Sequence, residues 1–209
     1  MISMKKIFIL GAFALLMTSL FSCSSCKTEK EAVSEEVTLV PEQCVSTDRE
    51  QMFLEFGDKY AWFETCVVYT NFLDEENDGA IDELANIFQV VTERDSCYDT
   101  KVVAFTYNKE TNYQKVISGF YVGDKPLNEE QIKLTFADAF EKLMATNLPK
   151  PHSRNVVLRK ELGPKPCNPQ YIFGNLKAQV YVDAVTGDVT DKNPAFEGFD
   201  LAAPLGEWP

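Results

Sequence analysis

The sequence predicts an α+β protein in which helices pack on antiparallel sheets. Short runs rich in β-branched and aromatic residues follow one another without long helices between them. One later segment, residues 128–144, changes to helical periodicity. Hydrophobic residues make up 45% of the 209-residue chain, which contains 15 phenylalanines. This apolar content is typical of a packed globular body.

The amino-terminal segment, residues 1–22, has two lysines, an apolar run and a small residue directly before Cys23. This order is typical of a secretion signal, whereas a transmembrane anchor needs about 20 apolar residues. Leu20-Phe21-Ser22-Cys23 resembles the bacterial lipobox, although Phe21 is bulkier than usual at its position. The resemblance implies cleavage after residue 22, a lipid such as palmitate on Cys23, and an anchor in a Gram-negative envelope. We expect the outer membrane and leave the leaflet open, periplasmic or surface.

Residues 23–43 are charged and lack aromatic side chains, which predicts a flexible tether. Because the signal segment contains two lysines and no acidic residue, its removal changes the net charge from −12 to −14. Such an acidic chain repels both nucleic acid and anionic lipid headgroups. We therefore expect no nucleic-acid partner, and membrane contact only through the lipid anchor.

The body divides into residues 44–125 and residues 126–209. In the first region, capping residues at Ser46-Thr47-Asp48 predict a helix that ends at Phe56 before Gly57. An antiparallel β-meander should follow, with strands at residues 62–73, 87–92, 102–107 and 113–122.

In the second region, Asn128 has the form of a helix cap, with Gln131 three residues later. A helix should run from here to about residue 144 and stop before Pro149. Two strands, residues 155–162 and 170–184, should follow. A loop-like tail from residue 193 should cover a face or edge of the sheet.

The last strand runs into Asp183-Ala-Val-Thr186-Gly187-Asp-Val, in which the Asp and Thr side chains can hydrogen-bond the turn and the Gly permits positive φ. With the preceding helix, this pattern resembles a PepSY-like domain over residues 126–192, as in Bacteroidetes lipoproteins. A Pro-rich insertion, residues 163–169, departs from the family pattern. The resemblance implies a non-enzymatic module without cofactor, found in protease propeptides and secreted lipoproteins, that sometimes restrains peptidases. The implied partner is an unknown envelope protein or peptide.

Residues 44–125 could be a diverged second PepSY-like unit, with residues 48–60 as its helix. No matching Asp-Ala-x-Thr-Gly turn occurs before residue 126, so this alternative stays open.

The body contains four cysteines, and an exported protein enters an oxidising compartment, so we expect disulfides among Cys44, Cys66, Cys97 and Cys167. Four cysteines allow three pairings. Cys66 and Cys97 fall in strands expected to be close, which favours that pair.

An acidic segment matches the start of an EF-type calcium loop, with ligands at Asp74, Glu76, Asp78 and Asp82. Ala85 stands where the loop requires a bidentate Glu. This loss favours a solvated acidic turn over a weak calcium site.

The single histidine, His152, lies in a basic stretch that we expect to pair with acidic groups of the same chain. A Cys–His nucleophile would need Cys167 as a thiolate, whereas an oxidising compartment favours disulfides.

The first hypothesis for the function is a binding module. The alternatives are a glycan hydrolase that uses paired carboxylates and a passive structural subunit of an envelope assembly.

Overall fold

The computed structural model describes residues 38–70, 80–94, 97–108, 112–119, 124–175 and 178–198. These residues form an α+β fold built on one eight-stranded antiparallel sheet, in the order β4-β3-β2-β1-β5-β6-β7-β8. The elements are, in chain order, α1 (Pro41–Phe56), β1 (Tyr60–Tyr69), β2 (Ile81–Arg94), β3 (Cys97–Asn108), β4 (Asn112–Ser118), the 3-10 turn η1 (Glu129–Gln131), α2 (Phe136–Met144), β5 (Asn155–Arg159), β6 (Gln170–Asn175), β7 (Ala178–Asp183) and β8 (Val189–Thr190).

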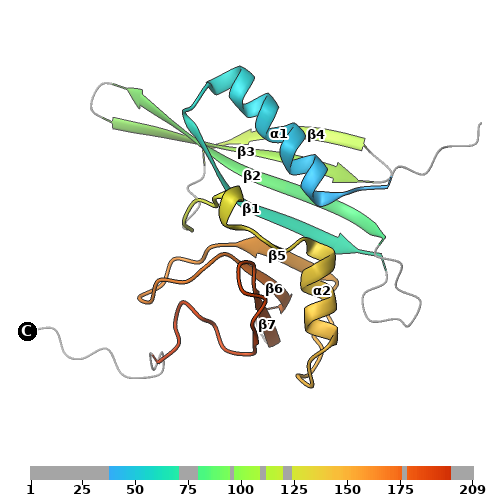
Figure 1. The fold of residues 1–209 in the computed structure, drawn as a ribbon. Helices are drawn as coiled ribbons and strands as arrows, with labels where there is room; N and C mark the ends of the chain where they lie inside the picture. Colours follow the sequence, from blue (N-terminus) through green and yellow to red (C-terminus); the bar gives the residue numbers. More distant parts are fainter. Residues whose placement is uncertain are drawn as a thin grey trace, which may run out of the picture. The chain divides into compact units, whose positions relative to one another are not determined.

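The strand order is mirrored about the centre of the sheet (Figure 1). β1 and β5 pair antiparallel at the centre, from Glu64 opposite Arg159 to Val68 opposite Asn155. From β1 the chain moves outward through β2 and β3 to β4, and from β5 it moves outward through β6 and β7 to β8. Each half therefore has the same layout, a helix followed by four antiparallel strands, and a single sheet crosses both regions that the sequence suggested.

Both helices pack against the same face of the sheet. Alternate residues of the strands form one apolar cluster together with Met52 of α1 and Leu143 of α2, each of which is fully buried. On β1 this face carries Trp62, Thr65 and Val67, whereas Glu64 points to the other face. The core therefore lies between the helices and the sheet.

The helix α1 begins earlier than the sequence predicts. Pro41 stands in its first turn, where a missing N–H costs nothing, and no side chain caps its start. Residues 41–43, which the sequence predicted to be part of the tether, are therefore helical. The end at Phe56 is confirmed, and the N–H of Gly57 bonds the carbonyl of Phe53 at 2.8 Å. Asp48, predicted to be part of the cap, is buried in the helix interior.

The second helix begins later than predicted. Asn128 does cap a turn, but that turn is the short η1, and the chain is then extended until a Thr135–Asp138 capping box starts α2. The N–H groups of Lys133 and Leu134 bond the carbonyl of Ala184, at 2.8 and 3.2 Å, instead of continuing a helix. Tertiary hydrogen bonds thus override the helical periodicity of residues 128–135.

The strand predicted over residues 170–184 is two strands, β6 and β7, which pair as a hairpin. Gly174 has φ +105°, and a Cβ there would lie 2.1 Å from the carbonyl oxygen of Ala178. Only glycine fits this close approach. Gly174-Asn175 is therefore the turn signal in the sequence, which the alternation of apolar and polar residues over 170–184 made easy to read as part of one strand. No helix within the described ranges is long and apolar enough to cross a membrane.

Candidate functional site

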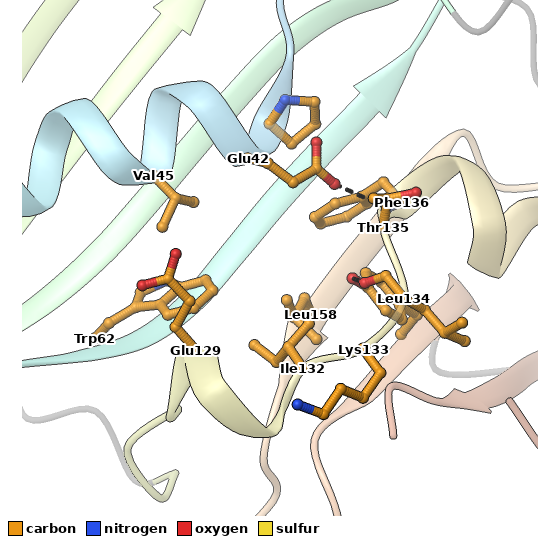
Figure 2. Close-up of a pocket in the computed structure, with 12 residues that line it drawn as sticks. Glu42, Val45, Trp62, Glu129, Ile132, Lys133, Leu134, Thr135, Phe136 and Leu158 are labelled. Atoms are coloured by element: carbon orange, nitrogen blue, oxygen red, sulfur yellow. Dashed lines mark hydrogen bonds between the residues drawn. The ribbon is translucent and has the colours of Figure 1, made fainter. Parts of the chain in front are cut away.

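An apolar pocket of about 200 Å³ opens between the first turns of α1 and the segment from η1 to α2 (Figure 2). Its walls come from both halves of the sheet, with Trp62 from β1, Leu158 from β5 and Tyr171 from β6. The remaining apolar lining comes from Pro41, Val45, Ile132, Leu134 and Phe136. Because these residues are widely separated in the sequence, the pocket exists only when the two halves are joined.

One hydrogen bond joins the two helices at the edge of this pocket. The Glu42 carboxylate accepts the N–H of Phe136 at 3.0 Å, across 94 positions of sequence. Phe136 is the first residue of α2, whose N–H has no partner within the helix. Asp138 completes this helix start by accepting the Thr135 N–H at 2.9 Å. Hydrogen bonds from the backbone and side chain of Thr135 lower the pKa of Asp138.

Charged groups surround the mouth of the pocket. Glu129 in η1 forms an ion pair with Arg49 of α1, which is a second polar link between the helix and this segment. Lys133 also lines the pocket, and its ammonium group donates to the carbonyl of Glu130 at 2.6 Å. The pocket therefore combines an apolar interior with a charged rim, as ligand-binding sites commonly do.

The Asp-Ala-x-Thr-Gly turn predicted from the sequence supports one wall of the pocket. Asp183 accepts the N–H groups of Val185 and Thr186 at 2.8 and 3.0 Å, and Gly187 has φ +78°. The turn geometry is thus the predicted one. Because the carbonyl of Ala184 in this turn bonds the extended segment 132–135, the turn holds the pocket-lining Ile132, Leu134 and Thr135 in place.

A chain of buried hydrogen bonds runs from the pocket beneath α1. The indole N–H of Trp62 lies 3.2 Å from the Thr65 hydroxyl, which donates to the Asn86 side chain at 2.6 Å. The Asn86 amide donates to Asp48 at 2.7 Å. Burial raises the pKa of Asp48, while its hydrogen bonds oppose the shift. This network ties α1 to the sheet directly behind the pocket.

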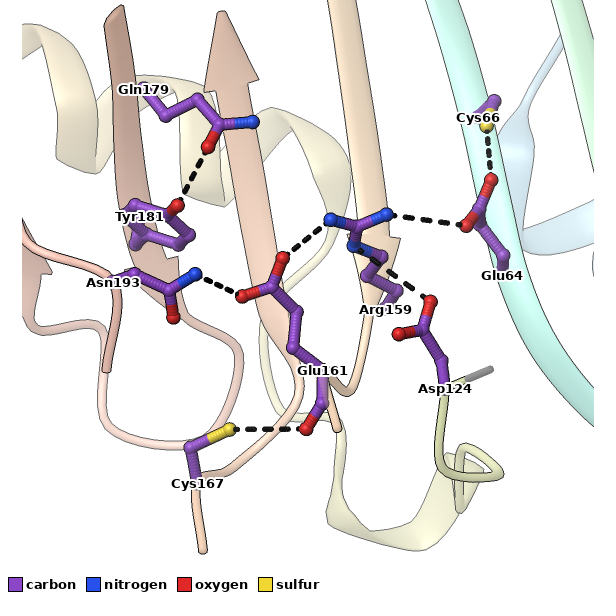
Figure 3. Close-up of polar contacts among 9 residues, drawn as sticks. All are labelled: Glu64, Cys66, Asp124, Arg159, Glu161, Cys167, Gln179, Tyr181 and Asn193. Carbon is purple, nitrogen blue, oxygen red and sulfur yellow. Dashed lines mark hydrogen bonds and ion pairs between the residues drawn. The ribbon is translucent and has the colours of Figure 1, made fainter. Parts of the chain in front are cut away.

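A second polar cluster lies on the sheet face opposite the helices (Figure 3). The Arg159 guanidinium forms an ion pair with Glu161 and lies 4.0 Å from Glu64 and 3.9 Å from Asp124. Glu161 also accepts from Asn193 of the carboxy-terminal segment. Burial raises the pKa of Asp124, while Arg159 opposes this shift. The basic stretch predicted to pair within the chain does so here, and again where Arg154 pairs with Asp82 at 3.1 Å.

The predicted disulfide between Cys66 and Cys97 is wrong. Cys66 lies level with Ala85 on β2 and Thr106 on β3, whereas Cys97 is nine positions away from Thr106 along β3. That separation is about 30 Å along the strand, and a disulfide needs Cα atoms within about 7 Å.

Cys44, Cys66 and Cys167 are free thiols. Burial raises the pKa of all three, with Cys44 at about 11, so their thiolate fractions at neutral pH are low. His152 is exposed in the loop before β5. The Cys–His nucleophile considered from the sequence therefore lacks an activated thiol.

Two sequence-based predictions fall mainly outside the described residues: the lipidation site Cys23, and the calcium-loop positions Asp74, Glu76 and Asp78. The fourth loop position, Asp82, accepts from Thr70 at 2.6 Å and pairs with Arg154. Within the part of the chain that the structure describes, no group of three or more His, Cys, Asp or Glu side chains is placed to hold a metal ion.

The residues that build the pocket were not singled out by the sequence. Glu42 lay in the predicted tether, and Glu129 and Ile132 lay in the predicted helix. The available signal was Thr135-Phe-Ala-Asp138, a second capping box that places the helix start later and leaves residues 132–135 extended.

No protein family matches the chain, and no curated protein is significantly similar to it in sequence. Among solved structures, the chain is similar to a predicted lipoprotein from Clostridium difficile 630. The two share 15% sequence identity and a TM-score of 0.39, over 76% of this chain and 95% of that chain.

Proposed function

We propose that this protein is a non-enzymatic binding module that captures a protein or peptide partner in the cell envelope. The observation that carries the proposal is the pocket of about 200 Å³ between α1 and residues 129–136, lined by Trp62, Phe136 and Leu158. Pockets that hold whole cofactors or drug-sized ligands are larger, about 300–1,000 Å³. A cavity of about 150 Å³ already accepts a benzene ring. The pocket is therefore sized for one apolar side chain.

A single buried apolar anchor is how many protein interfaces concentrate their binding energy. The walls of this pocket are held by backbone hydrogen bonds from Ala184 and by the Glu42–Phe136 link, so it needs little rearrangement to accept a side chain. This preorganisation supports binding of a partner over a passive structural role.

The sequence supports the location and the family resemblance of the proposed module. We propose that residues 1–22 are removed and that a lipid on Cys23 anchors the protein, with the outer membrane as the expected site. The helix, the antiparallel strands and the Asp183–Gly187 turn support a PepSY-like second half. The mirrored strand order supports a diverged unit of the same kind in the first half.

A glycan hydrolase is the second candidate, because two carboxylates, Glu42 and Glu129, line the same pocket. Glycosidases use such a pair as acid and base or nucleophile. However, each carboxylate already has a structural partner: Glu42 accepts the N–H of Phe136, and Glu129 pairs with Arg49. Both interactions join α1 to the segment from η1 to α2, so binding is the better account.

Blocking the pocket tests the proposal. Ile132 lies in the extended wall and is only half-buried, so Ile132→Trp should fill the pocket without disturbing the core. The matched control is Leu162→Trp, at a site that is 58% exposed and outside the pocket lining. Crosslinking on intact cells followed by mass spectrometry should recover a partner with the wild type and the control but not with Ile132→Trp.

Equal recovery of the crosslinked partner with all three proteins would show that the pocket does not take part in the interaction. A Glu42→Gln variant that abolishes hydrolysis in a screen of envelope polysaccharides would favour the hydrolase.

A further inference from the structure

We infer that the groove along one flank of α1 binds an extended peptide segment in which two apolar side chains enclose a basic one. This inference rests on the proposed function and specifies the chemistry of the partner. It starts from three hollows along the same flank of the helix. The pocket beside Trp62 is one of them, and the other two have volumes of about 460 and 440 Å³.

The second hollow, which we call the amino-terminal hollow, lies between the starts of α1 and α2. It has an apolar lining that includes Leu39, Tyr69, Ile81 and Phe140. It shares Pro41, Glu42, Thr135 and Phe136 with the pocket beside Trp62, so the two spaces are separated only by the Glu42–Phe136 link. Two apolar compartments therefore lie on either side of one carboxylate.

The third hollow continues along α1 past the Arg49–Glu129 ion pair, with Phe53, Leu54 and Tyr60 in its lining. Phe53 and Leu54 are 56% and 84% exposed, so they present apolar surface to a partner at this end of the helix. From Pro41 to Leu54 the helix rises about 20 Å, at 1.5 Å per residue. An extended peptide covers that length with about six residues.

The charge of this groove determines the chemistry of its occupant. Glu42 uses one oxygen to accept the Phe136 N–H, and its other oxygen has no hydrogen-bond partner among the described residues. Glu141 lines the amino-terminal hollow, and no basic side chain does. Lys133, beside the Trp62 pocket, is engaged by the carbonyl of Glu130. A basic side chain between two apolar anchors would therefore meet the Glu42 carboxylate.

Three labelled peptides test this inference, each with two leucines four positions apart and a lysine, a glutamine or a glutamate midway between them, so that the three side chains share one face of the extended chain. Binding is followed by fluorescence anisotropy, with the full protein purified from envelopes and reconstituted in phosphatidylcholine nanodiscs. Empty nanodiscs correct for partition into lipid. The lysine peptide should bind about three- to fivefold more tightly than the glutamine peptide, as expected for a partly exposed ion pair. The glutamate peptide should bind most weakly.

The Glu42→Gln variant removes the charge but keeps an oxygen that can accept the Phe136 N–H, so the fold should persist. It should abolish the preference for lysine, whereas Glu83→Gln, on the opposite face of the sheet, should preserve it. Equal binding of the three peptides would overturn the charge inference and leave the proposed function standing.

If no peptide binds to the protein above empty nanodiscs, the proposed function fails as well. A preference for lysine that survives in Glu42→Gln would place the recognition of charge elsewhere and overturn the inference. So would a concentration-dependent dimer that excludes the peptides, because a second copy would then fill the groove.

Discussion

The Tyr107 hydroxyl donates a 2.5 Å hydrogen bond to the Asp48 carboxylate, joining β3 to α1 across 59 positions of sequence. Asp48 is fully buried, and its other hydrogen bond comes from an uncharged amide of Asn86. A buried carboxylate that has only neutral donors as partners is costly to ionise. The link between α1 and the sheet therefore responds to pH.

Replacement of Asp48 by Asn should remove this pH dependence. The folded-state pKa of Asp48 lies above its unfolded-state value, because burial disfavours the charged form. The folded protein therefore holds the proton more tightly, and acidification from pH 7 toward pH 4 should stabilise the wild type through this group. Urea unfolding at several pH values should show the wild type gaining stability relative to Asp48→Asn as pH falls. A difference that stays constant with pH would contradict this assignment.

Loss of Arg159 should destabilise the fold far more than loss of Arg154. Arg159→Leu leaves Glu64, Glu161 and Asp124 facing one another without a cation, at a site where all three side chains are largely buried. We expect a loss of about 2–4 kcal/mol in the free energy of unfolding. Arg154→Leu breaks a pair in which the arginine is 53% exposed, and should cost less than about 1 kcal/mol. Urea titration of both variants checks this, and equal losses would refute it.

Gly174→Ala should disrupt the β6–β7 hairpin. The added Cβ would lie 2.1 Å from the Ala178 carbonyl oxygen at a φ of +105°, so the backbone would have to move. We expect a loss of roughly 2–4 kcal/mol, from strain and weakened pairing. Gly119→Ala, where nothing lies within 4 Å of the new Cβ, is the control and should be nearly neutral. Thermal melts of the two variants compare them directly, and similar midpoints would count against the close approach.

Cys44, Cys66 and Cys167 should resist alkylation in the folded protein. Burial raises the pKa of each thiol, and Glu64, which accepts from Cys66 at 2.8 Å, adds to the shift at that residue. Iodoacetamide near neutral pH should modify these three positions slowly before urea is added and rapidly afterwards, as read by peptide mass spectrometry. Rapid labelling of Cys66 in the native protein, or its recovery in a disulfide, would contradict the structure.

Local signals predicted much of the fold. The glycine after Phe56 ended α1, and β-branched and aromatic runs located the strands, because both depend on neighbouring residues alone. The helix predicted from Asn128 was wrong over residues 132–135, because backbone bonds to Ala184 decide the conformation of that segment. The one local signal within residues 128–144 is the Thr135–Asp138 capping box, which marks the start of α2 but not the bonds to Ala184.

The pocket could not be predicted from the sequence, because its residues come from distant parts of the chain. Glu42, Trp62, Phe136 and Tyr171 meet only because the central pair of strands joins the two halves of the sheet. Asp48 shows the same limit, since its position suggested a helix cap while its partners, Asn86 and Tyr107, lie on β2 and β3. Contacts across such separations leave no periodic trace in the chain.

The antiparallel seam between β1 and β5 is the arrangement that a two-fold axis through the middle of the sheet would produce. A polypeptide of half this length, one helix and four strands, could build an equivalent sheet by joining a copy of itself along that seam. When two such copies are part of one chain, the sequence of each half can change independently of the other. A cleft formed between two different halves can then bind an asymmetric ligand.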